Sequence, residues 1–228
     1  MAENEEGKKI IGKVVFLIAS MPKTIFFNIK TFGFTGMKLP VFVSYRTRIR
    51  CTYKGAIRIE APIKRFMMKY GYGGTAGVIS NASSEICLES GSELVLRGSA
   101  FFAEGCSIRN SGTIVLGKHC SFNKNSFLSC FKSISIGNGF VAGWNVNIRD
   151  SDGHALIKNG TKMPLDKPVV IGDRVWCASY VDILKGVRIG NNSVVAYRSL
   201  ITKSFEADNL LIGGSPARII QEHIDWEY

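Results

Sequence analysis

The segment Ile171–Lys203 reads IGDRVWCASYVDILKGVRIGNNSVVAYRSLITK and repeats every six residues. Aliphatic or small residues recur at one position of the repeat: Ile171, Cys177, Ile183, Ile189, Val195 and Ile201. Four residues after each of the first five comes a second small or branched residue: Val175, Val181, Val187, Ser193 and Ser199. A helix repeats about every 3.6 residues and a half-buried strand about every 2. A period of six predicts short strands with a turn after each, stacked as a parallel β-helix in which three hexads make one coil.

The same rhythm extends upstream with interruptions. The equivalent positions Leu96, Leu116 and Ile136 lie 20 residues apart, which is one coil with two extra residues at a corner. From Ile136 to Ile171 the step is 35 residues, so we expect one coil with a long excursion, which solenoids often place on the binding face. We predict an all-β chain in three parts. These are an N-terminal extension over residues 1–55, a β-helix domain over 56–212 with an excursion loop at 150–168, and a C-terminal helix and tail over 213–228.

Composition limits the range of partners. The 228 residues carry a formal net charge of +11 and are 46% hydrophobic, which is ample for a core. Such a charge favours anionic partners: phosphate-bearing cofactors, acidic saccharides or a membrane surface. The basic residues are dispersed along the chain and no nucleic-acid-binding motif occurs, so we expect no nucleic-acid partner.

The cysteines and the N-terminus bear on localisation. The six cysteines show no CxxC pair and no metal-ligand spacing, so we expect no metal site. Cys106, Cys120 and Cys177 occupy inward positions of the hexads and read as small buried hydrophobes, which suits a reducing compartment. No signal-peptide cleavage site follows Ile10–Met21, and no apolar run approaches the ~18 residues of a transmembrane helix. We therefore expect a cytoplasmic protein.

Both ends of the chain differ from the repeat. Apolar residues between Ile10 and Met21 follow helical spacing, and Pro22 is expected to end that helix. An aromatic-rich piece, Ile25 to Phe34, follows. Residues 10–34 could cap the open end of the β-helix, or could make a peripheral membrane contact. Near the other end, GGSPAR predicts a helix start, with Ser215 as N-cap and Pro216 in the first turn.

One of the three histidines stands out. His119 lies in a turn and His223 in the tail, whereas His154 follows Asp150-Ser151-Asp152-Gly153, where the hexad rhythm breaks. By register Asp152 should point inward, and a buried carboxylate is costly unless paired. A histidine beside carboxylates at the root of a loop is a candidate general base.

The run Ile171–Phe205, followed by GGSPARII, resembles the C-terminal half of hexapeptide-repeat acyltransferases. The segment GWNVNIRDSDGHAL resembles their active-site approach, and the subgroup most similar is that of bacterial capsule and lipopolysaccharide O-acetyltransferases. The resemblance implies a left-handed β-helix and a homotrimer with each active site between neighbouring prisms. It also implies direct acyl transfer from acetyl-CoA, with His154 as general base supported by Asp152 or Asp150.

Further residues match positions that hold acetyl-CoA in that family. Trp176 and Ala178 match the groove for pantetheine, and Lys203 and Arg218 match basic residues near the nucleotide. The chain has Ala196-Tyr197-Arg198 where the family often has Gly-Ala-Gly, so these three residues are expected to reshape the groove or add a phosphate contact.

The resemblance makes an O-acetyltransferase of a bacterial surface polysaccharide, or of its nucleotide-linked or lipid-linked sugar precursor, the leading expectation. It would act in the cytoplasm, either free or at the inner face of the membrane. A xenobiotic (antibiotic) O-acetyltransferase or an amino-sugar N-acyltransferase remains an alternative, as does a non-enzymatic β-helix scaffold. His154 separates the enzymes from the scaffold, because a scaffold has no need of DSDGH at the excursion.

Overall fold

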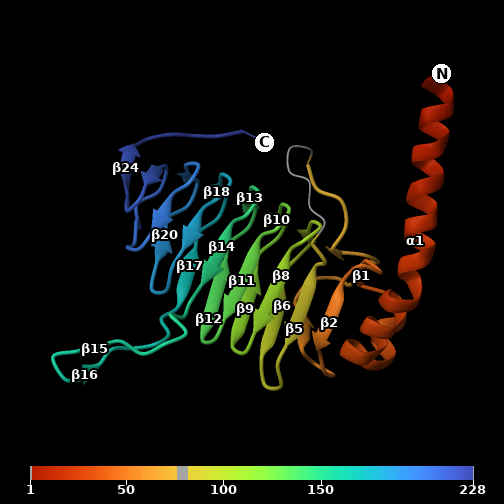
Figure 1. The fold of residues 1–228 in the computed structure, drawn as a ribbon, viewed down its shortest axis with the longest axis horizontal. Helices are drawn as coiled ribbons and strands as arrows, with labels where there is room; N and C mark the ends of the chain where they lie inside the picture. The colour runs from red at the N-terminus through yellow and green to blue at the C-terminus, as the bar shows by residue number, and fades with distance from the viewer. Residues whose placement is uncertain (1, 76–81, 228) are drawn as a thin grey trace.

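The strands stack into three parallel sheets that run the length of the molecule (Figure 1). The computed structural model describes residues 2–75 and 82–227, with the side chains of residues 2–10 excepted. Helix α1 (Ala2–Phe32) and the 3-10 helix η1 (Gly33–Lys38) stand at one end of the stack. A small antiparallel hairpin, β15 (Ile157–Lys158) and β16 (Thr161–Lys162), projects from its side.

Successive strands along the chain belong to sheets A, B and C in turn. Sheet A has the order β1 (Val41–Val43), β4 (Met68–Tyr70), β7 (Ala100–Phe102), β10 (Cys120–Phe122), β13 (Val141–Ala142), β18 (Trp176–Cys177), β21 (Val194–Val195), β23 (Leu211–Gly214) and β24 (Ala217–Gln221). Sheet B has the order β2 (Arg48–Cys51), β5 (Glu85–Leu88), β8 (Ser107–Asn110), β11 (Phe127–Cys130), β14 (Asn147–Arg149), β19 (Asp182–Ile183) and β22 (Leu200–Ile201). Sheet C has the order β3 (Ile57–Ile59), β6 (Glu93–Leu96), β9 (Thr113–Leu116), β12 (Ser133–Ile136), β17 (Val169–Ile171) and β20 (Arg188–Ile189).

The predicted register is confirmed. Leu96 pairs with Leu116, Leu116 with Ile136, Ile136 with Ile171, and Ile171 with Ile189. The 20-, 35- and 18-residue steps therefore all close one coil. The three stacked parallel sheets are consistent with a left-handed β-helix. The first coil is built from β1, β2 and β3, so the stack begins before residue 56.

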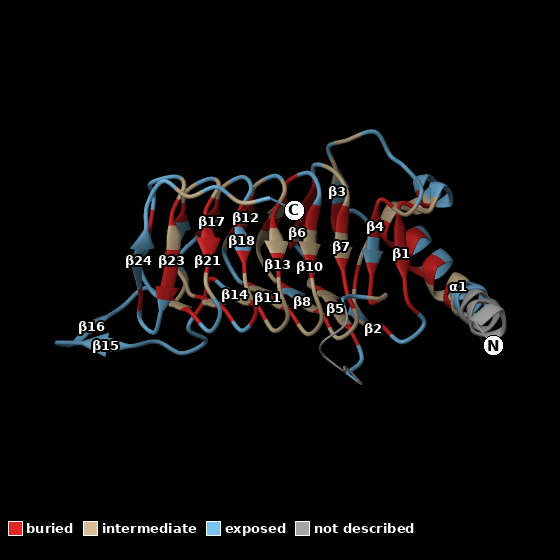
Figure 2. Ribbon diagram, turned by 90° about the horizontal axis from the view of Figure 1, so that it is seen from above, coloured by how far each residue is buried: buried red, intermediate tan, exposed pale blue. Residues whose placement is uncertain are grey.

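Side chains from all three sheets meet inside the stack. The inward residues of each sheet are buried (Figure 2), and they form continuous ladders of aliphatic and aromatic side chains. Phe102 and Phe122 stack face to face with ring centroids 4.4 Å apart. Burial of such ladders is the main favourable term for a solenoid, because each coil covers the apolar face of the next.

Two predictions about the ends are wrong. Helix α1 does not stop at Met21 but continues through Pro22 to Phe32. Pro22 faces solvent, and Thr24 and Asn28 in the following turns are buried against the first coil, so tertiary contacts hold the helix past the proline. As a result, Ile11–Lys38 is long and apolar enough to cross a membrane by length and composition, which the sequence analysis did not expect.

The predicted C-terminal helix is also absent. Ser215 and Pro216 are joined by a cis peptide bond in the turn between β23 and β24, which pair antiparallel. The backbone groups of Ala217–Gln221 are thus used in a sheet, where Ala217 pairs with Gly214 and Arg218 with Gly213. An N-cap needs a following helical turn, and this hairpin leaves none.

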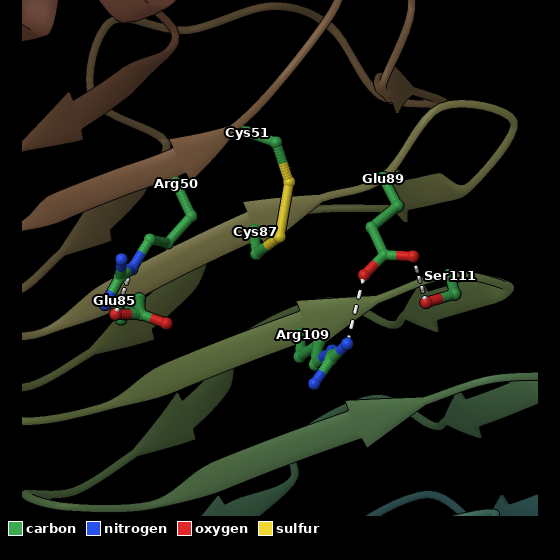
Figure 3. Close-up of a disulfide and its surroundings, with 7 residues drawn as sticks. All are labelled: Arg50, Cys51, Glu85, Cys87, Glu89, Arg109 and Ser111. Carbon is green, nitrogen blue, oxygen red and sulfur yellow. Dashed lines mark hydrogen bonds and ion pairs between the residues drawn. A yellow bond between two sulfur atoms is a disulfide. The ribbon is translucent and has the colours of Figure 1, made fainter.

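The cysteines divide into two groups. Cys106, Cys120 and Cys177 are buried and free, as predicted, and burial raises the pKa of the Cys106 and Cys120 thiols to about 12. Cys51 and Cys87, however, form a disulfide between β2 and β5 on the outside of adjacent coils (Figure 3). Disulfides are rare in reducing compartments, so this pair runs against the expectation drawn from the other cysteines.

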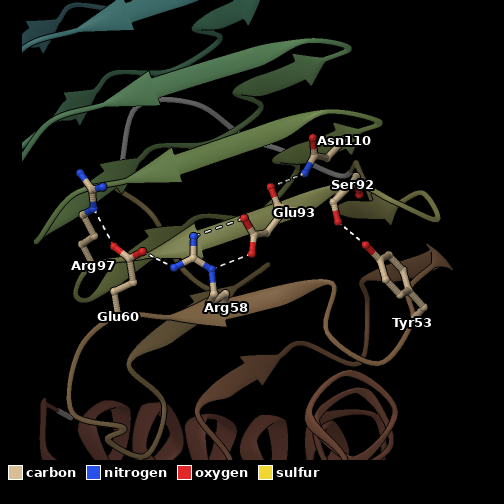
Figure 4. Close-up of polar contacts among 7 residues, drawn as sticks. All are labelled: Tyr53, Arg58, Glu60, Ser92, Glu93, Arg97 and Asn110. Carbon is tan, nitrogen blue, oxygen red and sulfur yellow. Dashed lines mark hydrogen bonds and ion pairs between the residues drawn. The ribbon is translucent and has the colours of Figure 1, made fainter.

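Ion pairs cross the outer faces of the N-terminal coils. Arg58 bridges Glu93 and Glu60, and Glu60 also accepts from Arg97 (Figure 4). These hydrogen bonds hold the pKa of Arg58 above its usual value, and those from Arg97 and then Arg58 hold the pKa of Glu60 below its own. All of these groups are solvent-exposed, so the network contributes little to stability and mainly neutralises charge on this face.

Candidate active site

The excursion leaves sheet B at Asp150, whose side chain is fully buried. Its carboxylate accepts hydrogen bonds from the backbone N–H groups of Phe131 (2.8 Å) and Lys132 (2.7 Å) in the corner of the preceding coil. The backbone N–H of Lys167 donates to the Asp150 carbonyl at 2.8 Å, where the chain returns. Asp150 thus fixes both ends of the excursion. Its carboxylate is fully used by the hydrogen bonds from Phe131 and Lys132.

Asp152 lies on the outside, so the predicted inward position is wrong. The chain departs from the hexad two residues earlier, and Asp150 takes the inward position that Cys130 holds in the coil below. The Asp152 carboxylate forms an ion pair with Lys185, whose Nζ also donates to the carbonyls of Pro164 (2.6 Å) and Leu165 (3.2 Å). Lys185 comes from the next coil and fastens the two arms of the excursion together.

His154 stands exposed at the root of the excursion, just beyond Gly153. Gly153 adopts a φ of 75°, a conformation that glycine takes readily, and its N–H donates to Ser151 Oγ at 3.2 Å. Within the described part of the chain, no hydrogen bond joins the His154 imidazole to Asp150 or Asp152. The ring is therefore open to a substrate from solvent.

Beyond His154 the excursion forms the β15–β16 hairpin. Its turn is Asn159-Gly160, with φ values of 49° and 75°. Asn-Gly is the strongest short-range signal for a two-residue hairpin turn, and this signal could have predicted the hairpin from sequence. Leu156 and Ile157 are exposed on the arm that leads into it.

A second set of predicted residues lines the corner between sheets A and B. Ala178 and Ala196 sit at successive levels, and the corners after them carry Tyr180 and Tyr197. Tyr197 meets Tyr180 edge-on, with ring centroids 5.4 Å apart. The Arg198 guanidinium lies 5.8 Å from the Tyr180 ring and 5.5 Å from the Tyr197 ring. Tyr180 was not among the predicted residues, although it lies 18 residues, or one coil, before Arg198.

Trp176 lies on the outer face of sheet A beneath the C-terminal tail. The Trp226 ring covers it, with centroids 6.0 Å apart, and the Trp226 indole N–H donates to the Arg174 carbonyl at 2.9 Å. Arg174 in turn stacks on the Trp226 ring at 5.5 Å. A small cleft of about 200 Å³ remains between Val141, Trp176 and Trp226.

The two predicted phosphate-binding cations lie apart. Lys203 follows β22 at the corner between sheets B and C, on the same edge of the molecule as Lys185 and the excursion. Arg218 is exposed on β24, at the end of sheet A. The predicted residues therefore occupy two edges of one prism and, for Trp176 and Arg218, the outer side of sheet A. His154, Asp152 and Lys203 share one, and Ala178, Ala196, Tyr197 and Arg198 share the other.

A further groove, of about 760 Å³, opens on sheet A nearer the helical end. Its lining includes His119, whose Nδ1 lies 2.9 Å from Ser99 Oγ. His119, which the sequence places in a turn, is exposed and also borders this groove. Within residues 2–75 and 82–227, no three His, Cys, Asp or Glu side chains gather in a way that could hold a metal ion.

Comparison with known proteins finds relatives among bacterial acetyltransferases. The chain is 32% identical over 149 residues to an uncharacterized 24.8 kDa protein in the cps region of Klebsiella pneumoniae, covering 64% of this chain and 66% of that protein. It is 31% identical over 125 residues to galactoside O-acetyltransferase of Escherichia coli K12, covering 54% and 57%. It is 30% identical over 137 residues to the E. coli K12 putative lipopolysaccharide biosynthesis O-acetyl transferase WbbJ, covering 54% and 69%.

The chain thus spans just under two thirds of the first protein and less of the second. No family model matches it. Among solved structures, the crystal structure of the polySia-specific acetyltransferase NeuO superposes with a TM-score of 0.52 at 20% identity, covering 80% of this chain and 84% of that one. This similarity supports the fold.

Proposed function

Because the chain belongs to the hexapeptide-repeat acetyltransferase family, we propose that it transfers an acetyl group from acetyl-CoA to a sugar hydroxyl of a bacterial surface polysaccharide or its precursor. The observation that carries the proposal is His154, an exposed imidazole held at the root of an excursion that leaves an otherwise regular stack. A scaffold gains nothing from this arrangement, whereas an acyl transfer needs an accessible base.

His154 acts as the general base. A sugar hydroxyl is a poor nucleophile at neutral pH, so a ring nitrogen of His154 takes its proton as the oxygen attacks the thioester carbonyl carbon. The tetrahedral intermediate collapses, the C–S bond breaks, and the proton passes to the departing thiolate of CoA. Backbone N–H groups at the coil corners stabilise the oxyanion. The four free cysteines are buried, so no thiol stands ready as a covalent nucleophile in the described residues.

Asp152 supports His154 by positioning it. Its ion pair with Lys185 ties the excursion to the next coil one residue before Gly153, and so limits where the imidazole can lie. Asp150 acts on His154 only indirectly, by anchoring the start of the excursion. Its carboxylate accepts hydrogen bonds from the backbone N–H groups of Phe131 and Lys132 and so is not free to bind the imidazole. An ionised Asp152 near the ring would also favour the imidazolium that forms during transfer.

Acetyl-CoA binds along the C-terminal coils. Small side chains at Ala178 and Ala196 leave room beside the corner, and Trp176 offers an apolar wall for pantetheine. The Arg198 guanidinium, with Tyr180 and Tyr197, suits a phosphate or an adenine ring, since arginine pairs with phosphate and stacks on planar groups. Lys203 and Arg218 supply further positive charge for the nucleotide end.

The active enzyme is a homotrimer. His154 and the Tyr197–Arg198 corner lie on different edges of one prism, separated by sheet B, so one copy cannot bring both to the same substrate. Parallel copies around a threefold axis would face one edge with the other. The exposed Leu156 and Ile157 on the projecting excursion would then be covered by a neighbour.

The experiment is a measurement of acetyl-CoA turnover by the purified protein against a panel of nucleotide sugars, saccharide fragments, amino sugars and antibiotics. The proposal expects CoA release with at least one saccharide hydroxyl acceptor. Turnover with antibiotics or amino sugars alone would show that the acceptor is one of these and not a saccharide hydroxyl. A protein that does not bind CoA would be a scaffold. We place the reaction in the cytoplasm, where cellular reductants would act on the Cys51–Cys87 disulfide of the structure. Thiol alkylation in intact cells checks this: the proposal expects Cys51 and Cys87 to react as free thiols, and an intact disulfide would contradict it.

A further inference from the structure

Helix α1 buries its polar face and exposes its apolar face, the reverse of an ordinary surface helix. Its buried side chains are mostly polar: Ser20, Thr24, Asn28 and Thr31 face the first coil. Asn28 accepts from the Val41 N–H (3.0 Å) and donates to the Val41 carbonyl (2.6 Å). Thr24 Oγ1 makes the same pair of contacts with Val43, at 3.1 and 3.0 Å. These side chains satisfy the open edge of β1 as a neighbouring strand would, so α1 caps the solenoid.

The opposite face of α1 is apolar and uncovered. Ile25 and Ile29 are exposed beside the docked half, and Phe34 of η1 is 93% exposed. The preceding stretch, Ile11–Ala19, projects beyond the prism, and Phe16 within it packs on the coil, against Tyr45 and Tyr72. Val14 and Leu17 border a hollow of about 300 Å³ beside the first coils, but remain 49% and 43% exposed. Ile11, Val15 and Ile18 face solvent. A soluble monomer rarely leaves so large a contiguous apolar surface open.

Most of the net charge of the chain lies at this end. Residues 1–59 hold eleven Lys and Arg against three acidic residues, Glu3, Glu5 and Glu6, a balance of +8. Residues 60–228 hold eighteen basic and fifteen acidic residues, a balance of +3. Among the described ion pairs of this segment, only Arg50 and Arg58 meet carboxylates. A groove of about 930 Å³ between α1 and β2 is lined by Lys23, Arg46, Arg48 and Arg50.

We propose that the outward face of α1 and η1 binds the surface of a lipid bilayer that contains anionic phospholipids. Apolar side chains enter the interface, and the basic groove meets phosphate headgroups. A bilayer explains both the exposed apolar face of α1 and the excess of basic residues beside it. Its hydrocarbon interior takes up apolar side chains, and its anionic headgroups attract the positive charge. A second copy of the chain would bring the same positive charge against itself.

The helix lies in the interface rather than across the membrane. The stretch Ile11–Lys38 is long enough to cross, but its C-terminal half is held to β1 by Thr24 and Asn28. The apolar part of the free stretch, Ile11–Ala19, is only about 14 Å long at about 1.5 Å per residue, well short of a hydrocarbon core of roughly 30 Å. The helical turns before it hold five charged residues: Glu3, Glu5, Glu6, Lys8 and Lys9. Capping and membrane binding are thus two faces of one segment.

The test is sedimentation of the full-length protein with vesicles of phosphatidylglycerol and phosphatidylethanolamine, and with phosphatidylcholine vesicles for comparison. We expect binding to the anionic vesicles that weakens as salt rises. The triple variant Ile11→Gln, Val15→Gln, Ile18→Gln keeps good helix formers and spares the capping face. Its partition into anionic vesicles should fall by roughly tenfold or more, with melting temperature and acetyl-CoA turnover on a soluble acceptor unchanged.

The matched control alters the other face. Asn28→Leu, or the milder Thr24→Val, removes hydrogen bonds to β1 and should lower the melting temperature while vesicle binding persists. Two results would overturn the proposal: an intact protein that never sediments with anionic vesicles at low salt, or a triple variant that binds them as the wild type does. A loss of self-association in the triple variant, without vesicle binding by the wild type, would assign the face to a second copy instead.

Discussion

Asp152 forms an ion pair with Lys185 across the root of the excursion that carries His154. Lys185 also donates to the carbonyls of Pro164 and Leu165 on the returning arm, so one ammonium group holds both arms. The proposed base, His154, is thereby placed by a side chain from the next coil rather than by a carboxylate hydrogen-bonded to its ring.

Replacement of Lys185 tests this positioning role. Lys185→Met should lower kcat by up to about a hundredfold, the loss expected when a catalytic group moves by about 1 Å. The KM for acetyl-CoA should rise less than kcat falls, because the lost ion pair holds the excursion and not the residues proposed to bind the cofactor. Lys185→Arg, which can keep the ion pair, should recover most of the rate. Equal loss in both variants would show that Lys185 does not act through the Asp152 pair.

The cations at the C-terminal coils should govern the affinity for acetyl-CoA. In the double variant Lys203→Glu, Arg218→Glu, the KM for acetyl-CoA should rise more than kcat falls, since the lost interaction is uniform binding. The difference from wild type should shrink as salt rises. Lys118→Glu, on another corner, is the matched control. An unchanged KM in the double variant would mean that residues other than Lys203 and Arg218 bind the nucleotide of CoA. Arg198 would then be the next residue to replace.

The sequence predicted the repeat well and the site only in part. The hexads predict register because each inward residue of a coil must stack on its equivalent, as Leu116 does on Ile136. The hexads do not predict how a chain leaves the stack. Asp150, not Asp152, is inward, because the corner amides of Phe131 and Lys132 supply partners that only the folded coil creates.

The ends were less predictable for the same reason. Pro22 is a local stop signal, but the polar contacts between α1 and β1 override it, and those contacts join residues about 20 positions apart in sequence. The SPAR segment carries a helix-start pattern, yet the free edge of β23 offers Ala217–Gln221 more backbone partners as a strand.

Assembly should be visible in solution. Multi-angle light scattering is expected to give three times the 25.1 kDa of the chain. Leu156→Glu with Ile157→Glu should shift the mass toward the monomer and lower turnover, because a charge in place of each apolar side chain opposes burial between copies. A fully active species of single-chain mass would rule out a shared site.

The tail contact at Trp226 should respond to acid. The backbone N–H of Trp226, then Asn192 and Arg174, hold the pKa of Asp225 below its usual value. Because the pKa of Asp225 is lowered in the docked state, the ionised carboxylate stabilises the docked tail at pH values above the ordinary Asp pKa. This stabilisation is lost as the pH falls through the lowered pKa. Tryptophan emission should therefore shift as the tail is released in acid, before the far-ultraviolet circular dichroism changes. Asp225→Asn should abolish that shift, and an identical acid profile in wild type and variant would refute the linkage.

The most direct test of the account is the kinetics of His154→Ala with the acceptor found in the turnover screen. The account predicts that kcat falls by about 10²–10⁴-fold, the usual cost of removing a general base, with acetyl-CoA binding and melting temperature retained. His119→Ala, which removes an exposed histidine that borders the groove on sheet A, should turn over at nearly the wild-type rate. Near-wild-type turnover by His154→Ala would contradict the central claim.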